Sequence, residues 1–103
     1  MYKIYFYVPV THLDKVKKAM FAKGAGKIGN YSCCAWQILG EGQFMPMTGS
    51  HAFIGEEGVL EKVPEYKVEM ICDEQHIKAV INTLKKTHPY EEPAYDVFRI
   101  EEF

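Results

Sequence analysis

The sequence predicts a small α+β domain with the element order β-α-β-β-α-β. Residues 2–8 and 65–72 alternate between apolar and polar side chains, which is the pattern of half-buried strands. Residues 13–20 and 77–84 carry apolar side chains three and four positions apart, which is the pattern of amphipathic helices. One further strand is expected after each helix, and this completes the order.

The composition limits both the architecture and the function. With 103 residues, the chain has the size of one domain, so we expect residues 1–103 to share one hydrophobic core. A formal net charge of −2 gives no excess of positive charge for neutralising phosphates, which argues against general nucleic-acid binding. No apolar stretch reaches the length of about 18 residues that a membrane helix needs, and no signal peptide is recognisable. We therefore expect a cytoplasmic protein.

The first strand and helix have recognisable ends. Pro9 should end the strand at residues 2–8, because proline has no N–H to donate. Thr11 is a suitable N-cap for the helix that follows, and Gly24 should end that helix.

The remaining elements are placed in the same way. Residues 32–39 are apolar, rich in cysteine and include Trp36, which suits a strand covered on both sides. Asp73 is expected to cap the second helix, and His88 to end it because proline follows. The last strand is expected at residues 94–100. This order corresponds to a ferredoxin-like sandwich, in which both helices cover one face of a four-stranded antiparallel sheet.

The other face of that sheet should carry Tyr5 and Tyr7, since they alternate with the buried residues of the first strand. Uncovered aromatic surface is typical of an interface, so we expect a homo-oligomer, either a dimer or a trimer. The alternative is that the tyrosines tolerate water through their hydroxyl groups.

Residues 40–63 do not fit a plain hairpin, because they contain five of the eight glycines. We expect an extended, irregular insertion between the second and third strands, with short accessory strands at 43–47 and 59–63.

The three cysteines give no disulfide framework, because their number is odd and Cys33 and Cys34 would point to opposite faces of a strand. We expect them, together with Cys72, to be reduced.

Residues 24–29 match the glycine pattern G-x-G-x-x-G of dinucleotide-binding loops. Those loops follow a strand and precede a helix, whereas this segment follows a helix and precedes a strand. The pattern therefore favours a helix stop with a tight turn. The alternative is an anion-binding loop, formed by backbone N–H groups with Lys27 nearby.

The segment HPYEEP at 88–93 combines an imidazole, a phenol and two carboxylates between two prolines. Such a turn could hold a polar ligand or a divalent cation, with His88, Glu91 and Glu92 as metal ligands. The alternative is a stiff connection with solvated acids. The sequence contains no H-x-H, H-E-x-x-H or G-x-S-x-G motif, so it suggests no catalytic residues.

Four segments together resemble the inserted domain of the Nif-three-like (YqfO) proteins: GAGKIGNYSCC (24–34), GEGQFMP (40–46), IGEEGVLEKVPEYKVE (54–69) and HPYEEPAYDV (88–97). The last segment is also similar to one in CutA, a trimeric ferredoxin-like protein that resembles PII signalling proteins in fold. The resemblance implies a CutA/PII-like sheet that associates into oligomers. Full-length Nif-three-like proteins carry a two-metal centre in the halves that flank this insert, and none of its ligands can be carried over to this sequence.

Our hypothesis is therefore a stand-alone, non-enzymatic, homo-oligomeric binding module. Its ligand would lie where the glycine loop and the HPYEEP turn approach each other or a neighbouring subunit. One alternative is a metal-binding protein or metal-dependent enzyme that uses the HPYEE turn, and another is a domain that docks a protein partner. No other cofactor is expected. The candidate ligand-binding residues are Gly24, Gly26, Lys27, Gly29, Tyr31, His88, Tyr90, Glu91 and Glu92.

Overall fold

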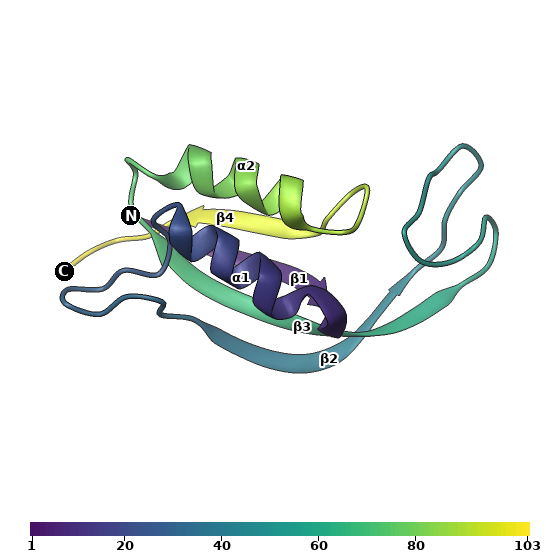
Figure 1. The fold of residues 1–103 in the computed structure, drawn as a ribbon, viewed down its shortest axis with the longest axis horizontal. Coiled ribbons are helices and arrows are strands. Elements are labelled where there is room, and N and C mark those ends of the chain that lie inside the picture. Colours follow the sequence, from purple (N-terminus) through teal and green to yellow (C-terminus); the bar gives the residue numbers. More distant parts are fainter.

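The computed structural model describes residues 1–103 and confirms the predicted fold class. The four strands form one antiparallel sheet in the order β2-β3-β1-β4, and both helices lie on the same face of it (Figure 1). No helix is both long and apolar enough to span a membrane. The elements are β1 (Tyr2–Pro9), the 3-10 helix η1 (Val10–His12), α1 (Leu13–Ala22), β2 (Trp36–Phe44), β3 (Glu61–Cys72), α2 (Ile77–Thr87) and β4 (Tyr95–Arg99).

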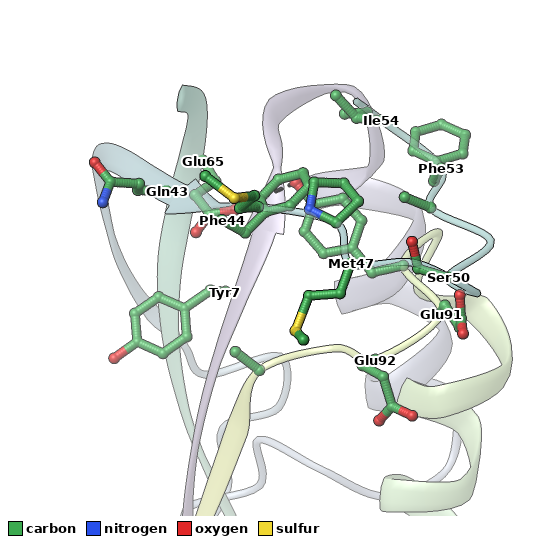
Figure 2. Close-up of a pocket in the computed structure, with 15 residues that line it drawn as sticks. Tyr7, Gln43, Phe44, Met47, Ser50, Phe53, Ile54, Glu65, Glu91 and Glu92 are labelled. Atoms are coloured by element: carbon green, nitrogen blue, oxygen red, sulfur yellow. Dashed lines mark hydrogen bonds between the residues drawn. The ribbon is translucent and has the colours of Figure 1, made fainter. Parts of the chain in front are cut away.

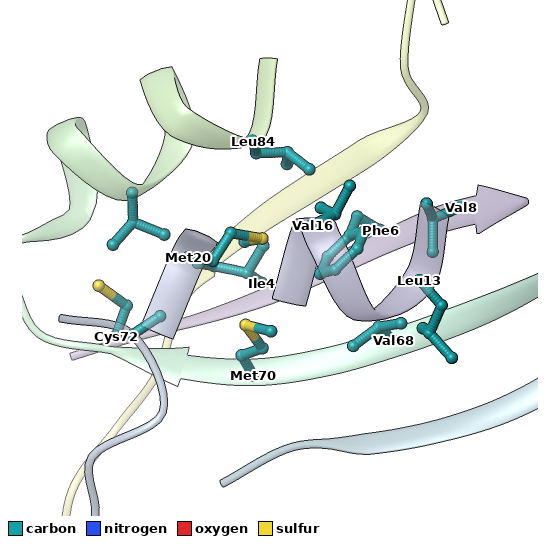
Figure 3. Packing of buried hydrophobic residues seen from close by; sticks show 12 residues of the cluster. Ile4, Phe6, Val8, Leu13, Val16, Met20, Val68, Met70, Cys72 and Leu84 are labelled. Atoms are coloured by element: carbon teal, nitrogen blue, oxygen red, sulfur yellow. The ribbon is translucent and has the colours of Figure 1, made fainter. Parts of the chain in front are cut away.

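The core lies between the two helices and the central strands β1 and β3 (Figure 3). The alternation of β1 turns every second side chain toward the helices, and β3 does the same beside it, so that Phe6 pairs with Val68 and Ile4 with Met70. Each fully buried apolar side chain contributes about 1.5–3 kcal/mol. The cluster consists of Ile4, Phe6, Val8, Leu13, Val16, Met20, Ala25, Val68, Met70, Cys72, Val80 and Leu84.

The end of α2 is as predicted, but the starts of both helices differ from the prediction. The Asp73 carboxylate accepts a hydrogen bond from the backbone N–H of His76 at 2.9 Å and so closes the turn before α2, whereas the N-cap of the helix itself is His76, which makes no capping side-chain bond. His88 ends α2 with an extended backbone. Thr11 does not cap α1. A 3-10 turn occupies Val10–His12, and the Thr11 hydroxyl lies 2.8 Å from its neighbour His12 instead.

The second strand differs from the prediction in both position and environment. It begins at Trp36, whereas residues 32–35 form an irregular segment in which Cys33 has a positive φ of 57°. All three cysteines are free. β2 is an edge strand, and Trp36 and Ile38 remain 56% and 52% exposed. The apolar composition predicted a strand covered on both sides. In the structure this segment is instead an exposed edge strand.

Residues 40–63 are more regular than predicted. β2 and β3 continue as a paired ribbon from Gly40 opposite Glu65 to Phe44 opposite Glu61. Only residues 45–60 form an irregular loop, which projects beyond the helices at one end of the elongated molecule (Figure 1). Of the predicted accessory strands, residues 43–44 and 61–63 are strand and extend the two main strands, whereas residues 45–47 and 59–60 belong to the loop.

The glycine segment ends α1 in a Schellman motif, as the sequence favoured. The N–H of Gly24 donates to the carbonyl of Phe21 at 3.1 Å, and the N–H of Ala25 donates to that of Met20 at 3.2 Å. Gly24 has a φ of +113°, a conformation that residues with a Cβ rarely adopt.

We predict that Gly24→Ala destabilises the fold. A Cβ at this position would lie 2.6 Å from Cγ of His76, and the positive φ adds strain. We expect the free energy of unfolding to fall by about 2–4 kcal/mol, measured by urea denaturation. Gly29→Ala is the matched control: its φ is +56°, nothing lies within 4 Å, and the expected loss is about 1 kcal/mol. Equal losses in the two variants would contradict this account.

Candidate functional site

A pocket of about 400 Å³ lies where the loop at 45–60 folds against the HPYEEP turn (Figure 2). β1 contributes Tyr7 to its lining, and the residue before β4 contributes Ala94. The lining is mostly apolar, as is usual for sites that bind small organic molecules. Its apolar side chains from the ribbon and the loop are Phe44, Met45, Pro46, Met47, Phe53 and Ile54.

A few polar groups also line the pocket. The hydroxyl of Tyr90 donates to the carboxylate of Glu65 at 3.5 Å, and Glu91 and Glu92 add two further carboxylates. The Oγ atom of Ser50 is buried without a hydrogen-bond partner. A buried hydroxyl without a partner is costly in a native protein and often marks a position where a ligand or water binds.

The carboxylate of Glu65 occupies space that Gly42 leaves free on the adjacent strand. A Cβ at Gly42 would collide with this carboxylate. Burial raises the pKa of Glu65, and the hydrogen bond from Tyr90 partly opposes this shift. Burial, with the nearby charge of Glu65, raises the pKa of Tyr90 to about 12. The phenol therefore stays protonated at neutral pH and serves as a hydrogen-bond donor.

His88 fastens the HPYEEP turn to the sheet. Its Nε2 lies 2.6 Å from the carbonyl oxygen of Tyr7, and its Nδ1 accepts a hydrogen bond from the backbone N–H of Tyr90 at 3.1 Å. Since a carbonyl only accepts, Nε2 carries the hydrogen and the ring is neutral. Burial lowers the pKa of His88, and the hydrogen bond to Tyr7 partly opposes this effect. The imidazole is 5% exposed and has no free nitrogen.

The structure does not assemble the metal ligands that the sequence suggested. Both nitrogens of His88 are occupied, and Glu91 accepts a hydrogen bond from the backbone N–H of His51 at 2.7 Å. No group of three or more histidine, cysteine or acidic side chains in the structure is placed to hold a metal ion. His88 therefore has a structural position here, while Glu91 and Glu92 face the pocket.

The glycine loop and the HPYEEP turn do not meet within one chain, contrary to one form of our hypothesis. The N–H of Gly26 donates to the carbonyl of Ile71, and Ile71 pairs with Lys3 near the start of β1. The ring of His88 binds the carbonyl of Tyr7 near the end of the same strand. Four residues of strand separate the two positions by about 13 Å. A site that uses both loops would thus need a second subunit.

Most of the backbone N–H groups at the start of the glycine loop are used within the chain, because those of Gly24, Ala25 and Gly26 all donate to carbonyl oxygens. Lys27, Gly29 and Tyr31 are exposed at the end of the sheet opposite the pocket, so they are not part of it.

Sequence reasoning found Tyr90, Glu91 and Glu92 but missed Ser50, Glu65 and the apolar walls. One signal was available for Glu65. Gly40 and Gly42 occupy alternate positions of one strand, and this leaves a strip without side chains that a neighbour must fill. Ser50 lies in an irregular loop whose fold has no local sequence pattern, so nothing pointed to it.

Comparison with solved structures identifies the fold class. CutA from Archaeoglobus fulgidus, described as a periplasmic divalent cation tolerance protein, superposes with a TM-score of 0.68 at 18% identity. The match covers 100% of this chain and 87% of that protein. At this identity the likeness shows the fold alone, which is CutA-like.

More similar proteins identify the family of this domain. The GTP cyclohydrolase 1 type 2 homolog of Halalkalibacterium halodurans is 47% identical over 98 residues, which cover 95% of this chain and 26% of that protein. The crystal structure of a Bacillus cereus protein related to NIF3 matches with a TM-score of 0.83 and 40% identity, over 98% of this chain and 26% of that one. No family model matches.

The chain is therefore homologous to one domain of the NIF3-related (Nif-three-like, YqfO) proteins, as its motifs indicated. It spans about a quarter of the length of the curated relatives that it matches.

We predict that His88 makes the fold sensitive to acid. An unfolded histidine protonates near pH 6.5, whereas the folded pKa is lower, so below pH 6.5 the unfolded state binds the extra proton. Stability should fall by up to about 1.4 kcal/mol per pH unit from there until the folded pKa is reached. Urea denaturation across this range should show a shallower decline for His88→Gln, because that variant lacks the titrating ring.

The control for this experiment is His51→Gln, in which an exposed histidine is removed. It should keep the pH dependence of the natural protein. If His88→Gln also keeps that dependence, the buried imidazole is not its source.

Proposed function

We propose that this chain is a cytoplasmic, non-enzymatic, homo-oligomeric module that binds a small organic molecule in the pocket beside the HPYEEP turn. The observation that carries the proposal is the convergence of three separate segments on that pocket. The ribbon segment GEGQFMP, the following loop and the HPYEEP turn all contribute to its lining.

The form of the pocket supports this binding role. Its volume of about 400 Å³ lies within the usual range of ligand sites, about 300–1,000 Å³. The walls are mainly apolar, while Ser50, Glu65 and Tyr90 place polar atoms at separate points. Such an arrangement binds a ligand through apolar contact and orients it through hydrogen bonds.

The chemistry of the pocket supports binding without catalysis. Ser50 is its only aliphatic hydroxyl, and this group has no hydrogen-bonded base to activate it as a nucleophile. With a pKa of about 12, Tyr90 holds its proton at neutral pH and makes a poor acid. The relatives carry the name GTP cyclohydrolase 1 type 2 homolog, but the chain corresponds to only about a quarter of their length.

The sheet face opposite the helices supports self-association. Trp36, Ile38 and Phe98 on this face are each at least half exposed. The ring of Tyr5 packs at 5.4 Å from that of Phe98, so the aromatic surface is continuous across β1 and β4. Apolar surface of this kind commonly marks an interface, and a second copy of the chain would bury it.

We predict that Ile38→Glu disrupts the oligomer. This substitution places a charge in the proposed interface, so sedimentation equilibrium should show a monomer where the natural protein forms a dimer or trimer. Leu39→Glu is a closely matched control, because Leu39 is 54% exposed, Ile38 is 52% exposed, and adjacent strand residues point to opposite faces. It should leave the subunit number unchanged. A monomeric natural protein, or equal effects of the two variants, would contradict self-association through this face.

We also predict that Ala52→Trp blocks the pocket. Ala52 is part of its lining, and a tryptophan there would fill much of the space. When small aromatic fragments are titrated into the natural protein, the backbone amide signals of Phe44, Ser50 and Tyr90 should shift. The variant should weaken binding of the fragments by about tenfold or more.

Ala79→Trp, an exposed position on α2 outside the pocket, is the control and should bind the fragments normally. Binding that survives Ala52→Trp unchanged would show that the fragments bind elsewhere.

A further inference from the structure

We propose that the pocket selects an amphipathic organic cation, namely an amine that carries an aromatic or branched apolar group. This inference rests on the proposed function, since it specifies the charge and shape of the molecule that the pocket would bind. Four features of the lining support it: its unpaired carboxylates, its aromatic rings, its unpartnered hydroxyl and its lack of basic side chains.

The carboxylates that face the pocket have no cation of their own. Glu65, Glu91 and Glu92 all line it, and no lysine, arginine or histidine does. The five ion pairs of the structure join other residues, so none of them neutralises these three side chains. Figure 2 shows Glu91 and Glu92 on neighbouring positions of the turn and Glu65 on the ribbon. Charges on two sides of one cavity produce a negative potential between them.

Aromatic rings complete a surface that suits a cation. The rings of Phe44 and Tyr90 lie 5.7 Å apart with an interplanar angle of 56°, and both belong to the lining, as do Tyr7 and Phe53. A cation is attracted to the face of an aromatic ring within about 6 Å. The apolar residues between the rings would accommodate the hydrocarbon part of the ligand.

The hydrogen-bonding groups match an ammonium group better than a neutral or anionic one. A primary ammonium carries three donors and no acceptor. The Oγ of Ser50 is buried and unpartnered and can accept, and the Glu65 carboxylate accepts from Tyr90 with lone pairs remaining. An ammonium placed here would also offset the burial of the Glu65 charge.

The same features disfavour phosphate-bearing or carboxylate ligands. An anion in this pocket would face three carboxylates with no basic side chain to compensate. Like charges within one cavity repel each other, and the partial burial of the cavity weakens the screening of this repulsion by salt.

The test uses three molecules of similar shape and different charge: 2-phenylethylamine, 2-phenylethanol and 3-phenylpropanoate. Each is titrated into the full chain at neutral pH, and binding is followed through the amide signals of Phe44, Ser50 and Tyr90. We expect the amine to bind about fivefold or more tightly than the alcohol, and the alcohol more tightly than the carboxylate. The preference for the amine should decrease as salt is raised from about 20 to 300 mM, because salt screens the carboxylates.

Glu65→Gln identifies the source of the preference. This variant should reduce the preference for the amine over the alcohol about fivefold, because it removes the negative charge but keeps a side chain of the same shape. Glu69→Gln is the matched control: Glu69 lies on the same strand and the same face, outside the pocket, and its loss should affect neither ligand. If Glu65→Gln does not fold, the double variant Glu91→Gln and Glu92→Gln, at exposed positions, should reduce the same preference.

The outcomes separate the two proposals. Binding of the alcohol or carboxylate as tightly as the amine would overturn the cation preference while leaving the pocket as a binding site. A preference for the amine that survives removal of these carboxylates would also overturn it. If none of the three molecules shifts the pocket signals, both the preference and the proposed binding function fail.

Discussion

The buried hydrogen bonds of His88 are the interaction on which the candidate site depends. One ring nitrogen donates to the carbonyl of Tyr7 in β1, and the other accepts from the backbone N–H of Tyr90 in the turn. The ring of Tyr90 then packs at 4.9 Å from the imidazole and reaches Glu65 with its hydroxyl. A single neutral imidazole thus connects the end of α2, the central strand and the ribbon that carries the pocket.

The polar lining of the pocket lowers the stability of the protein without a ligand. The raised pKa of Glu65 means that its ionised form is less favourable in the folded protein than in the unfolded chain. Stability from this group is therefore greatest at low pH and decreases as the pH rises and the carboxyl ionises. The unpaired hydroxyl of Ser50 adds a second unfavourable feature. Such costs are common where a protein is organised for binding rather than for maximum stability.

The sequence predicted the elements whose residues alternate or repeat clearly. β1, β3 and α2 were placed well, because burial on one face imposes a regular spacing on their apolar residues. The environment of β2 was wrong because Trp36, Ile38 and Leu39 lie in the strand as predicted but are apolar and exposed, so their hydrophobicity does not report burial in this chain. The start of α1 was wrong because a 3-10 turn replaced the expected cap at Thr11.

The candidate site was harder to predict than the fold, because its residues meet only through tertiary structure. The HPYEEP segment stood out by composition, but composition does not distinguish a metal-binding imidazole from one that holds two backbone groups. That distinction depends on where β1 passes, and Tyr7 is 81 positions away from His88 in the sequence. Ser50 and Glu65 likewise reach the pocket only because the ribbon extends beyond the sheet and its loop folds back.

Tyr7 links the two parts of the proposed function. Its side chain lies on the same open sheet face as Tyr5, since both alternate with the buried residues of β1, and it also lines the pocket. Its carbonyl holds His88 and thereby the position of Tyr90. A second copy that covered the sheet face would remove water from one wall of the pocket and restrict β1 there. Loss of water strengthens the interaction of the pocket carboxylates with a cation, so assembly through this face would act on ligand binding through the same strand.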